Sequence, residues 1–321
     1  MIDWKLALST ATRLSKPGPD VSAHEVAEAV AELREGAARS EQPVRAFSNL
    51  HARSATAPVL IVDRPRWIEA NLETFRVLMD PVVAKLVAAD KVPTGLGKVV
   101  GEKVGGAELG ALMSFMSSKV LGQFDPFWVG PNGEAGRLLL VAPNIVQVER
   151  QLGVDPHDFR LWVCLHEETH RVQFTAVPWL SGHMRSLLDE FIEATDLDSS
   201  ALSKMLGDSL GEAVKIIRGE SEASLSELFQ SPRQREIVDQ LTGIMSLLEG
   251  HADVVMDGVG PDVIPTVAEI RRKFNERRKG AGGLDRLVRR LLGLDAKMRQ
   301  YRDGAEFVRA VMDKDGPDGF H

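Results

Sequence analysis

The sequence predicts a mainly α-helical fold with one small β element. Apolar residues recur at intervals of three and four along much of the 321-residue chain, as they do on one face of an amphipathic helix. Helix-start signals precede several of these stretches, whereas one segment has the two apolar runs around a turn cluster that indicate a β-hairpin. A hydrophobic content of 44% is ample for a sizeable core.

The first two predicted helices lie in the N-terminal part of the chain. Ser22 and Glu25, three residues apart, form the pattern of a capping box and start the first helix. Asp63 and Pro65 start the second. Its apolar face consists of residues at helical spacing, namely Ile68, Leu72, Phe75 and Met79. Residues 37–57, between the two helices, are predicted to be a loop-rich connection.

The next segment, residues 97–122, is rich in glycine and other small residues. Its most apolar part, residues 105–122, contains Glu108 and Lys119. These charges leave about ten unbroken apolar or small residues, against the roughly 20 that are needed to cross a bilayer. We therefore expect a buried helix that packs closely on its neighbours, and no transmembrane segment.

The β element and the remaining helices follow. Residues 124–145 contain two apolar runs around Pro, Asn and Gly, so they are predicted to form a hairpin. Asp155 and Pro156 start a helix that continues through residue 170, and Ser231 and Pro232 start another. In the C-terminal part, residues 271–283 are predicted to form a solvated turn. Two amphipathic helices follow, at residues 284–294 and 298–311, and then a frayed tail at residues 313–321.

Composition excludes several classes of protein. The chain has 39 basic and 46 acidic residues and a net charge of -7, without the basic stripe that a nucleic acid partner requires. Near the N-terminus, Asp3 and several hydroxyl residues interrupt the apolar stretch, which is not typical of a signal peptide. A single cysteine, Cys164, rules out an intramolecular disulfide and fits a reducing compartment. We therefore expect a cytoplasmic protein.

Two histidines in the segment LHEETH indicate a metal site. His166 and His170 are four residues apart, so in a helix both project from one face and can reach one zinc ion. They lie in line with Phe159 and Val163, on the face that is predicted to be buried. Two buried imidazoles are costly unless a shared ligand such as a metal satisfies them. The alternative is an ordinary surface helix in which the motif is accidental. By chance alone, HExxH occurs in roughly one such chain in a hundred.

Acidic residues complete the predicted site. Glu167 follows the first histidine, so it lies beside the metal, where a glutamate takes a proton from water that zinc has made more acidic. On the predicted helix that starts at Ser231, Glu249 is the candidate third ligand. Asp253, one turn later, is predicted to accept a hydrogen bond from the far ring nitrogen of a metal-bound histidine. Gly250, next to this ligand, is predicted to relieve crowding where the Glu249 helix and the histidine helix approach each other.

These motifs resemble known ones. HEETH followed by EGHAD is similar to the gluzincin pattern of the zincin superfamily, HExxH with a later ExxxD. More closely, LHEETHRVQFTAVPWL and SLLEGHADVVMD resemble the zincin-like metallopeptidase family common in actinobacteria, some members of which are labelled as associated with coenzyme F420 biosynthesis. The similarity runs over most of the chain. Family members continue past the position of His321, so a further C-terminal segment is an expectation.

The resemblance implies a fold and a set of roles. The fold would be that of zincin-like metallopeptidases, with residues 1–123 as an N-terminal helical region packed on a catalytic region, residues 124–321, in one compact unit. The implied roles are zinc binding by His166, His170 and Glu249, general base catalysis by Glu167, and support by Asp253. Residues 138–145 are similar to the edge strand with which zincins bind an extended substrate.

Several other residues are weaker candidates. Gluzincins place a Tyr or His near the developing oxyanion, and the single tyrosine, Tyr301, fits that role, although a half-buried structural tyrosine is the alternative. His251 is predicted to face away from the metal. Glu168 is predicted to point into solvent or to Arg171, and Cys164 to be a core residue. Two further residues are candidate substrate contacts, His183 and Arg302.

The sequence therefore predicts a zinc-dependent metallopeptidase that hydrolyses a peptide or another amide bond. The alternative is a non-catalytic zincin scaffold that acts as an interaction protein, in which zinc stabilises the fold or the cleft is blocked. Both alternatives predict bound zinc. The substrate, endo- or exopeptidase preference and the oligomeric state are left open.

Overall fold

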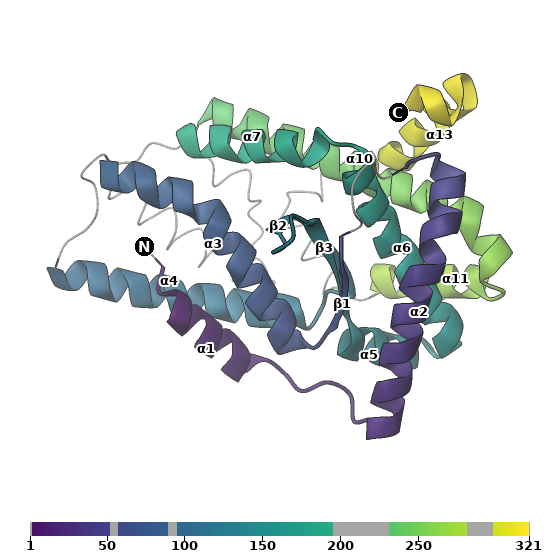
Figure 1. Cartoon of the computed structure of the whole chain (residues 1–321), viewed down its shortest axis with the longest axis horizontal. Coiled ribbons are helices and arrows are strands. Elements are labelled where there is room, and N and C mark those ends of the chain that lie inside the picture. Colours follow the sequence, from purple (N-terminus) through teal and green to yellow (C-terminus); the bar gives the residue numbers. More distant parts are fainter. Residues whose placement is uncertain (1, 52–56, 89–94, 195–230, 281–297, 321) are drawn as a thin grey trace.

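The computed structural model describes residues 2–51, 57–88, 95–194, 231–280 and 298–320 (Figure 1). It is mainly helical, with one three-stranded sheet, which confirms the predicted fold class. The helices are α1 (Trp4–Leu14), α2 (Ala23–Ser48), α3 (Arg64–Ala88), α4 (Gly95–Ser117), α5 (Ala142–Leu152), α6 (Pro156–Ala176), α7 (Leu180–Glu193), α10 (Pro232–Val263), α11 (Val267–Gly280) and α13 (Met298–Phe320). The strands are β1 (Val59–Val62), β2 (Gly122–Val129) and β3 (Ala135–Val141).

The predicted hairpin is confirmed, but the sheet also has a strand that the sequence did not predict. β2 pairs antiparallel with β3, and β1 pairs parallel with the other side of β3. The order is thus β1-β3-β2, which puts Leu138, Leu139 and Leu140 in the central strand. The prediction of an edge strand at residues 138–145 is therefore wrong. Among the described strands, β1 and β2 form the edges.

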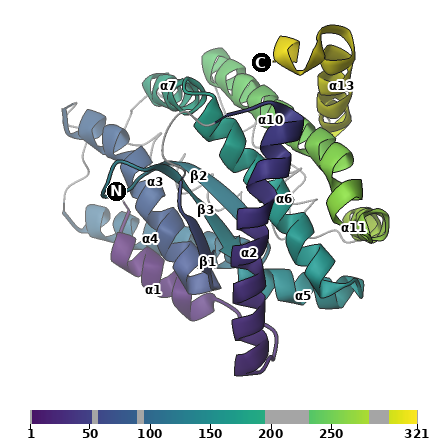
Figure 2. The same cartoon turned by 45° about the vertical axis from the view of Figure 1, so that its right-hand side comes forward.

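Helix α2 is longer than predicted. It begins at the capping box of Ser22 and Glu25, as expected, but it continues through Pro43 to Ser48, so the loop predicted from residue 37 is wrong. Ala37 and Val44 lie in the same buried cluster as residues of α6, and burial of this face outweighs the local cost of a proline inside a helix. Figure 2 shows α2 and α6 side by side.

Helix α4 packs against α1 through its small residues, as predicted. A Cβ atom at Gly106 would lie 2.6 Å from the Asp3 carbonyl oxygen, and one at Gly110 would lie 2.6 Å from that of Ala7. Glycine at these two positions therefore permits the close approach of the helices. None of the helices in the described part of the chain is long and apolar enough to cross a membrane.

The C-terminal helices differ from prediction at two points. Residues 271–280 belong to helix α11 and do not form a turn, since Ile270 is buried and Phe274 packs against Trp162, which tie the helix to the core. Helix α13 extends past residue 311, with a kink at Gly316, where φ is 74°, so the predicted frayed tail is largely helical. The helix predicted at residues 284–294 lies outside the described residues.

The main core lies between α2, α6, α10, α11 and the sheet. Its largest fully buried side chains include Phe159, Leu165 and Met256. The predicted division of the chain after residue 123 falls within β2, and the two-region organisation stays a prediction.

Cys164 is a core residue, as predicted, and its chemistry can be tested. The side chain is fully buried, with its sulfur 3.6 Å from the Leu33 carbonyl oxygen. Burial, with the nearby carboxylates of Glu167 and Glu168, raises the pKa of the thiol well above its usual range. The thiolate is the reactive form, so we expect alkylation of the native protein to be at least about 100-fold slower than that of the urea-unfolded protein. Equal rates by mass spectrometry would contradict this burial.

Candidate metal centre

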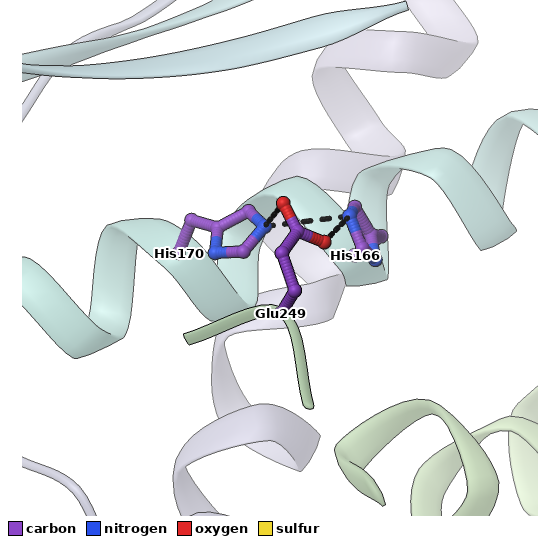
Figure 3. Close-up of side chains that lie close together, drawn as sticks. All are labelled: His166, His170 and Glu249. Atoms are coloured by element: carbon purple, nitrogen blue, oxygen red, sulfur yellow. Dashed lines mark hydrogen bonds and ion pairs between the residues drawn. The ribbon is translucent and has the colours of Figure 1, made fainter. Parts of the chain in front are cut away.

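Three side chains from two helices converge on one point (Figure 3). Nε2 of His166 is 3.3 Å from Nε2 of His170. The carboxylate of Glu249 bridges them, with one oxygen 3.7 Å from His166 Nε2 and the other 3.7 Å from His170 Nε2. One ligand atom from each residue lies within 4.8 Å of the others. The structure thus brings together the two motif histidines and the predicted third residue.

Local sequence explains how helix α6 presents the histidines. Asp155 caps the helix by accepting a hydrogen bond from the amide of Asp158 at 2.9 Å, and Pro156 occupies the first turn. His166 and His170 then lie one turn apart. They are half-buried, with 24% and 13% of their side-chain surface exposed, while Phe159 on the same face is completely buried. An ion at this site would therefore be reachable from solvent.

The three residues fit a metal ion in both chemistry and spacing. Two imidazole nitrogens and a carboxylate oxygen are a common ligand set for catalytic zinc. Atoms bound to a tetrahedral zinc ion at about 2.0–2.1 Å lie about 3.3 Å from one another. The two Nε2 atoms, 3.3 Å apart, match that value, and a different oxygen of Glu249 lies 3.7 Å from each of them. With a single oxygen as the ligand, the three atoms lie within 4.8 Å of one another.

Glu167 lies next to the three residues but is more deeply buried. It is 8% exposed, and burial raises the pKa of its carboxyl to about 7, an effect that His170 opposes and Glu249 reinforces. The first residue of β2, Gly122, makes room for this group, because a Cβ atom there would lie 2.5 Å from the carboxyl carbon of Glu167. The carboxyl is therefore held between α6 and the start of the β2 edge strand.

The second glutamate of the motif has a structural role. Glu168 is fully buried and pairs with Arg171, which confirms the second of its two predicted alternatives, solvent or Arg171. Arg171 donates to both oxygens of Glu168, and also to Glu41 of α2 and to the Ala57 carbonyl oxygen. Burial raises the pKa of Glu168 to about 7, and Arg171 opposes this shift. The pair thus joins α6 to α2.

Gln173 was not singled out by the sequence, yet it contacts the site directly. Its side-chain oxygen lies 2.9 Å from Nδ1 of His170, on the far side of the ring from Glu249. Its side-chain nitrogen lies 2.9 Å from the Leu248 carbonyl oxygen and 2.8 Å from Nδ1 of His251. The spacing of three residues after His170 on a helix was the signal that could have indicated this contact.

The predicted supporting residues have different outcomes. For His170, the acceptor at the far ring nitrogen is Gln173, not Asp253. Asp253 is partly buried, and its backbone carbonyl oxygen accepts a hydrogen bond from Arg271. A hydrogen bond from a ring nitrogen of His166 to Asp253 stays a prediction. His251 is buried and contacts the site through Gln173. His183 lies in helix α7, with its ring edge-to-face with Trp179.

Gly250 allows a close helix crossing beside Glu249, but the helix that crosses α10 there is α13 and not the predicted histidine helix, α6. A Cβ atom at Gly250 would lie 2.5 Å from the carbonyl carbon of Gly304, and one at Gly304 would lie 2.5 Å from the Ser246 carbonyl oxygen. Helix α13 thus passes directly over the segment that carries the carboxylate. Tyr301 and Arg302 are in this helix, one turn before Gly304, but their side chains lie outside the described residues.

Comparison with known proteins shows the family of this chain. A search of curated proteins found no match. A protein from Chloroflexus aurantiacus, provisionally described as a hydrolase with a novel fold, has a similar crystal structure, with a TM-score of 0.67 and 28% sequence identity. The match covers 98% of this chain and 89% of that one. The family model of the zincin-like metallopeptidases matches residues 2–321. The chain therefore belongs to the zincin-like metallopeptidase family.

Proposed function

We propose that the protein is a zinc-dependent peptidase of the gluzincin type, in which His166, His170 and Glu249 hold the metal and Glu167 is the general base. The observation that carries this proposal is the convergence of the three ligand atoms beside a buried glutamate. Family membership and the similarity to a described hydrolase support the same reaction class.

Each residue has a definite task in the proposed reaction. A zinc ion at this site would lower the pKa of water and polarise the carbonyl group of a substrate. Glu167 would take the proton from the attacking water and pass it to the leaving amine. Burial raises the pKa of this carboxyl, which makes it a stronger base than an exposed glutamate. Gly122 leaves the space that the carboxyl occupies.

The edge strand β2 favours an extended peptide as the substrate. β2 forms one edge of the described sheet, and its first residue, Gly122, lies against Glu167. A peptide backbone that added to this edge by strand pairing would pass the proposed base. This assigns the substrate-binding edge to β2, in place of the central strand β3.

Other parts of the proposal extend beyond these contacts. Tyr301 is the proposed donor to the developing oxyanion, because helix α13 crosses α10 next to Glu249. Asp253 is the proposed partner of a ring nitrogen in the metal site. The proposed location is the cytoplasm, which the single cysteine supports. The motifs also resemble those of actinobacterial family members that are labelled as associated with coenzyme F420 biosynthesis.

Metal removal tests the proposed activity. The purified protein, incubated with a peptide library, should produce cleavage products that mass spectrometry detects. Treatment with a chelator should abolish these products, because the site loses the ion that acidifies water, and addition of one equivalent of zinc should restore them. Zinc binding without any zinc-dependent cleavage would contradict the peptidase and favour the non-catalytic scaffold.

A further inference from the structure

We propose that Gln173 is a positioning residue of the metal centre, which fixes the tautomer of His170 and joins it to the helical segment that carries Glu249. This inference rests on the proposed function, since it concerns a ligand of the proposed metal. It starts from three contacts made by one side chain that is only 4% exposed.

The orientation of the Gln173 amide follows from its contact with the main chain. The Leu248 carbonyl oxygen, 2.9 Å from the Gln173 side-chain nitrogen, is solely an acceptor, so the amide NH2 group must face it. The amide oxygen therefore faces His170. This assignment needs no assumption about either histidine.

The tautomer of His170 then follows from the amide orientation. The Gln173 oxygen is an acceptor 2.9 Å from Nδ1 of His170, so Nδ1 must carry the hydrogen. In a neutral imidazole the other nitrogen, Nε2, then has a free lone pair. Nε2 is the atom that lies 3.3 Å from His166 Nε2 and 3.7 Å from Glu249. The amide thus prepares the correct nitrogen for a metal.

His251 is oriented by the same amide. The second N–H of Gln173 points to Nδ1 of His251, 2.8 Å away, so this nitrogen accepts the hydrogen bond. His251 is 2% exposed and follows Glu249 by two residues on α10. Gln173 therefore contacts residues both before and after Glu249 in the sequence, namely Leu248 and His251. One side chain therefore couples a ligand of α6 to the ligand of α10.

The test compares zinc affinities of variants by competition with a chromophoric chelator. Gln173→Leu removes the acceptor and both donors, and we expect zinc to bind about 10–100-fold more weakly, the usual effect of losing a partner of a metal-bound histidine. Gln173→Glu keeps an acceptor for His170 Nδ1 but loses the donors to the Leu248 carbonyl oxygen and His251, so it should bind zinc at least about threefold more tightly than Gln173→Leu. Gln234→Leu is the matched control, because Gln234 is 5% exposed in the first turn of α10 and forms part of its capping box.

A second readout follows the tautomer itself. In metal-free protein labelled with 15N-histidine, long-range proton–nitrogen spectra should show the hydrogen of His170 on Nδ1 in the wild type and in Gln173→Glu. Gln173→Leu should show a mixture of both tautomers. A role limited to joining the helices would change stability without changing this signal.

The outcomes separate the two proposals. Unchanged zinc affinity in Gln173→Leu, or an equal loss in the Leu and Glu variants, would overturn the role of Gln173. If Gln173→Leu does not fold, the His170 tautomer in Gln173→Glu decides, and a hydrogen on Nε2 in that variant would count against the proposal. A wild-type protein that binds no zinc would instead contradict the proposed metal centre.

Discussion

Replacing Glu167 with glutamine is expected to lower kcat for peptide cleavage by roughly 10²–10⁴-fold, the usual contribution of a general base, while zinc remains bound. Glutamine has nearly the same shape, so it fills the space between α6 and Gly122. It lacks the basic oxygen that takes the proton from water. The measurement is kcat per bound zinc, with metal content determined by mass spectrometry.

The neighbouring glutamate provides a matched control. Glu168 is buried on the same helix and has a pKa raised to about 7 for the same reason, but its carboxylate binds Arg171 instead of facing the metal site. Glu168→Gln should therefore lower the unfolding temperature and leave kcat per zinc unchanged. If both variants lose activity equally, or if Glu167→Gln keeps full activity, Glu167 is not the base.

Replacing Glu249 with alanine is expected to weaken zinc binding by more than about 100-fold. Loss of a direct ligand should exceed the roughly 10–100-fold effect of losing a residue that only supports a ligand. Two histidines alone would then hold the ion. Isothermal titration of the metal-free variant with zinc measures this change.

A glutamate elsewhere on the same helix controls for the loss of charge. Glu236 lies near the start of α10 with 58% of its side chain exposed, where it pairs with Arg233. Glu236→Ala should bind zinc as the wild type does. A Glu249→Ala protein that retains wild-type affinity would refute the assignment of the third ligand and leave the histidine pair as the only support for a metal.

Local spacing explains which parts of the site the sequence could predict. His166, Glu167 and His170 are within five residues of one helix, so helical geometry alone places them. Glu249 is 79 residues after His170, and its assignment depended on the resemblance to a known pattern. Gln173 satisfies the same local spacing as the histidines, but a glutamine carries no metal-binding signal of its own.

Long-range contacts explain what the sequence left open or predicted wrongly. Glu168 is buried because Arg171 bridges it to Glu41 and Ala57, residues more than 100 positions away that a local pattern cannot include. Pro43 favours a break locally, yet packing against α6 keeps α2 helical. Strand β1 has only four residues, and apolar and polar residues do not alternate in it, so its pairing with β3 is what identifies it as a strand. Because of this pairing, β3 lies in the centre of the sheet and not at its edge.

The most direct test of the account is a crystal structure of the zinc-loaded protein with anomalous diffraction recorded at the zinc absorption edge. We predict one strong anomalous peak, within about 2.0–2.2 Å of His166 Nε2, His170 Nε2 and a carboxylate oxygen of Glu249. Absence of a peak at these residues in a protein shown to contain zinc, or a peak bound without Glu249, would contradict the proposed metal centre.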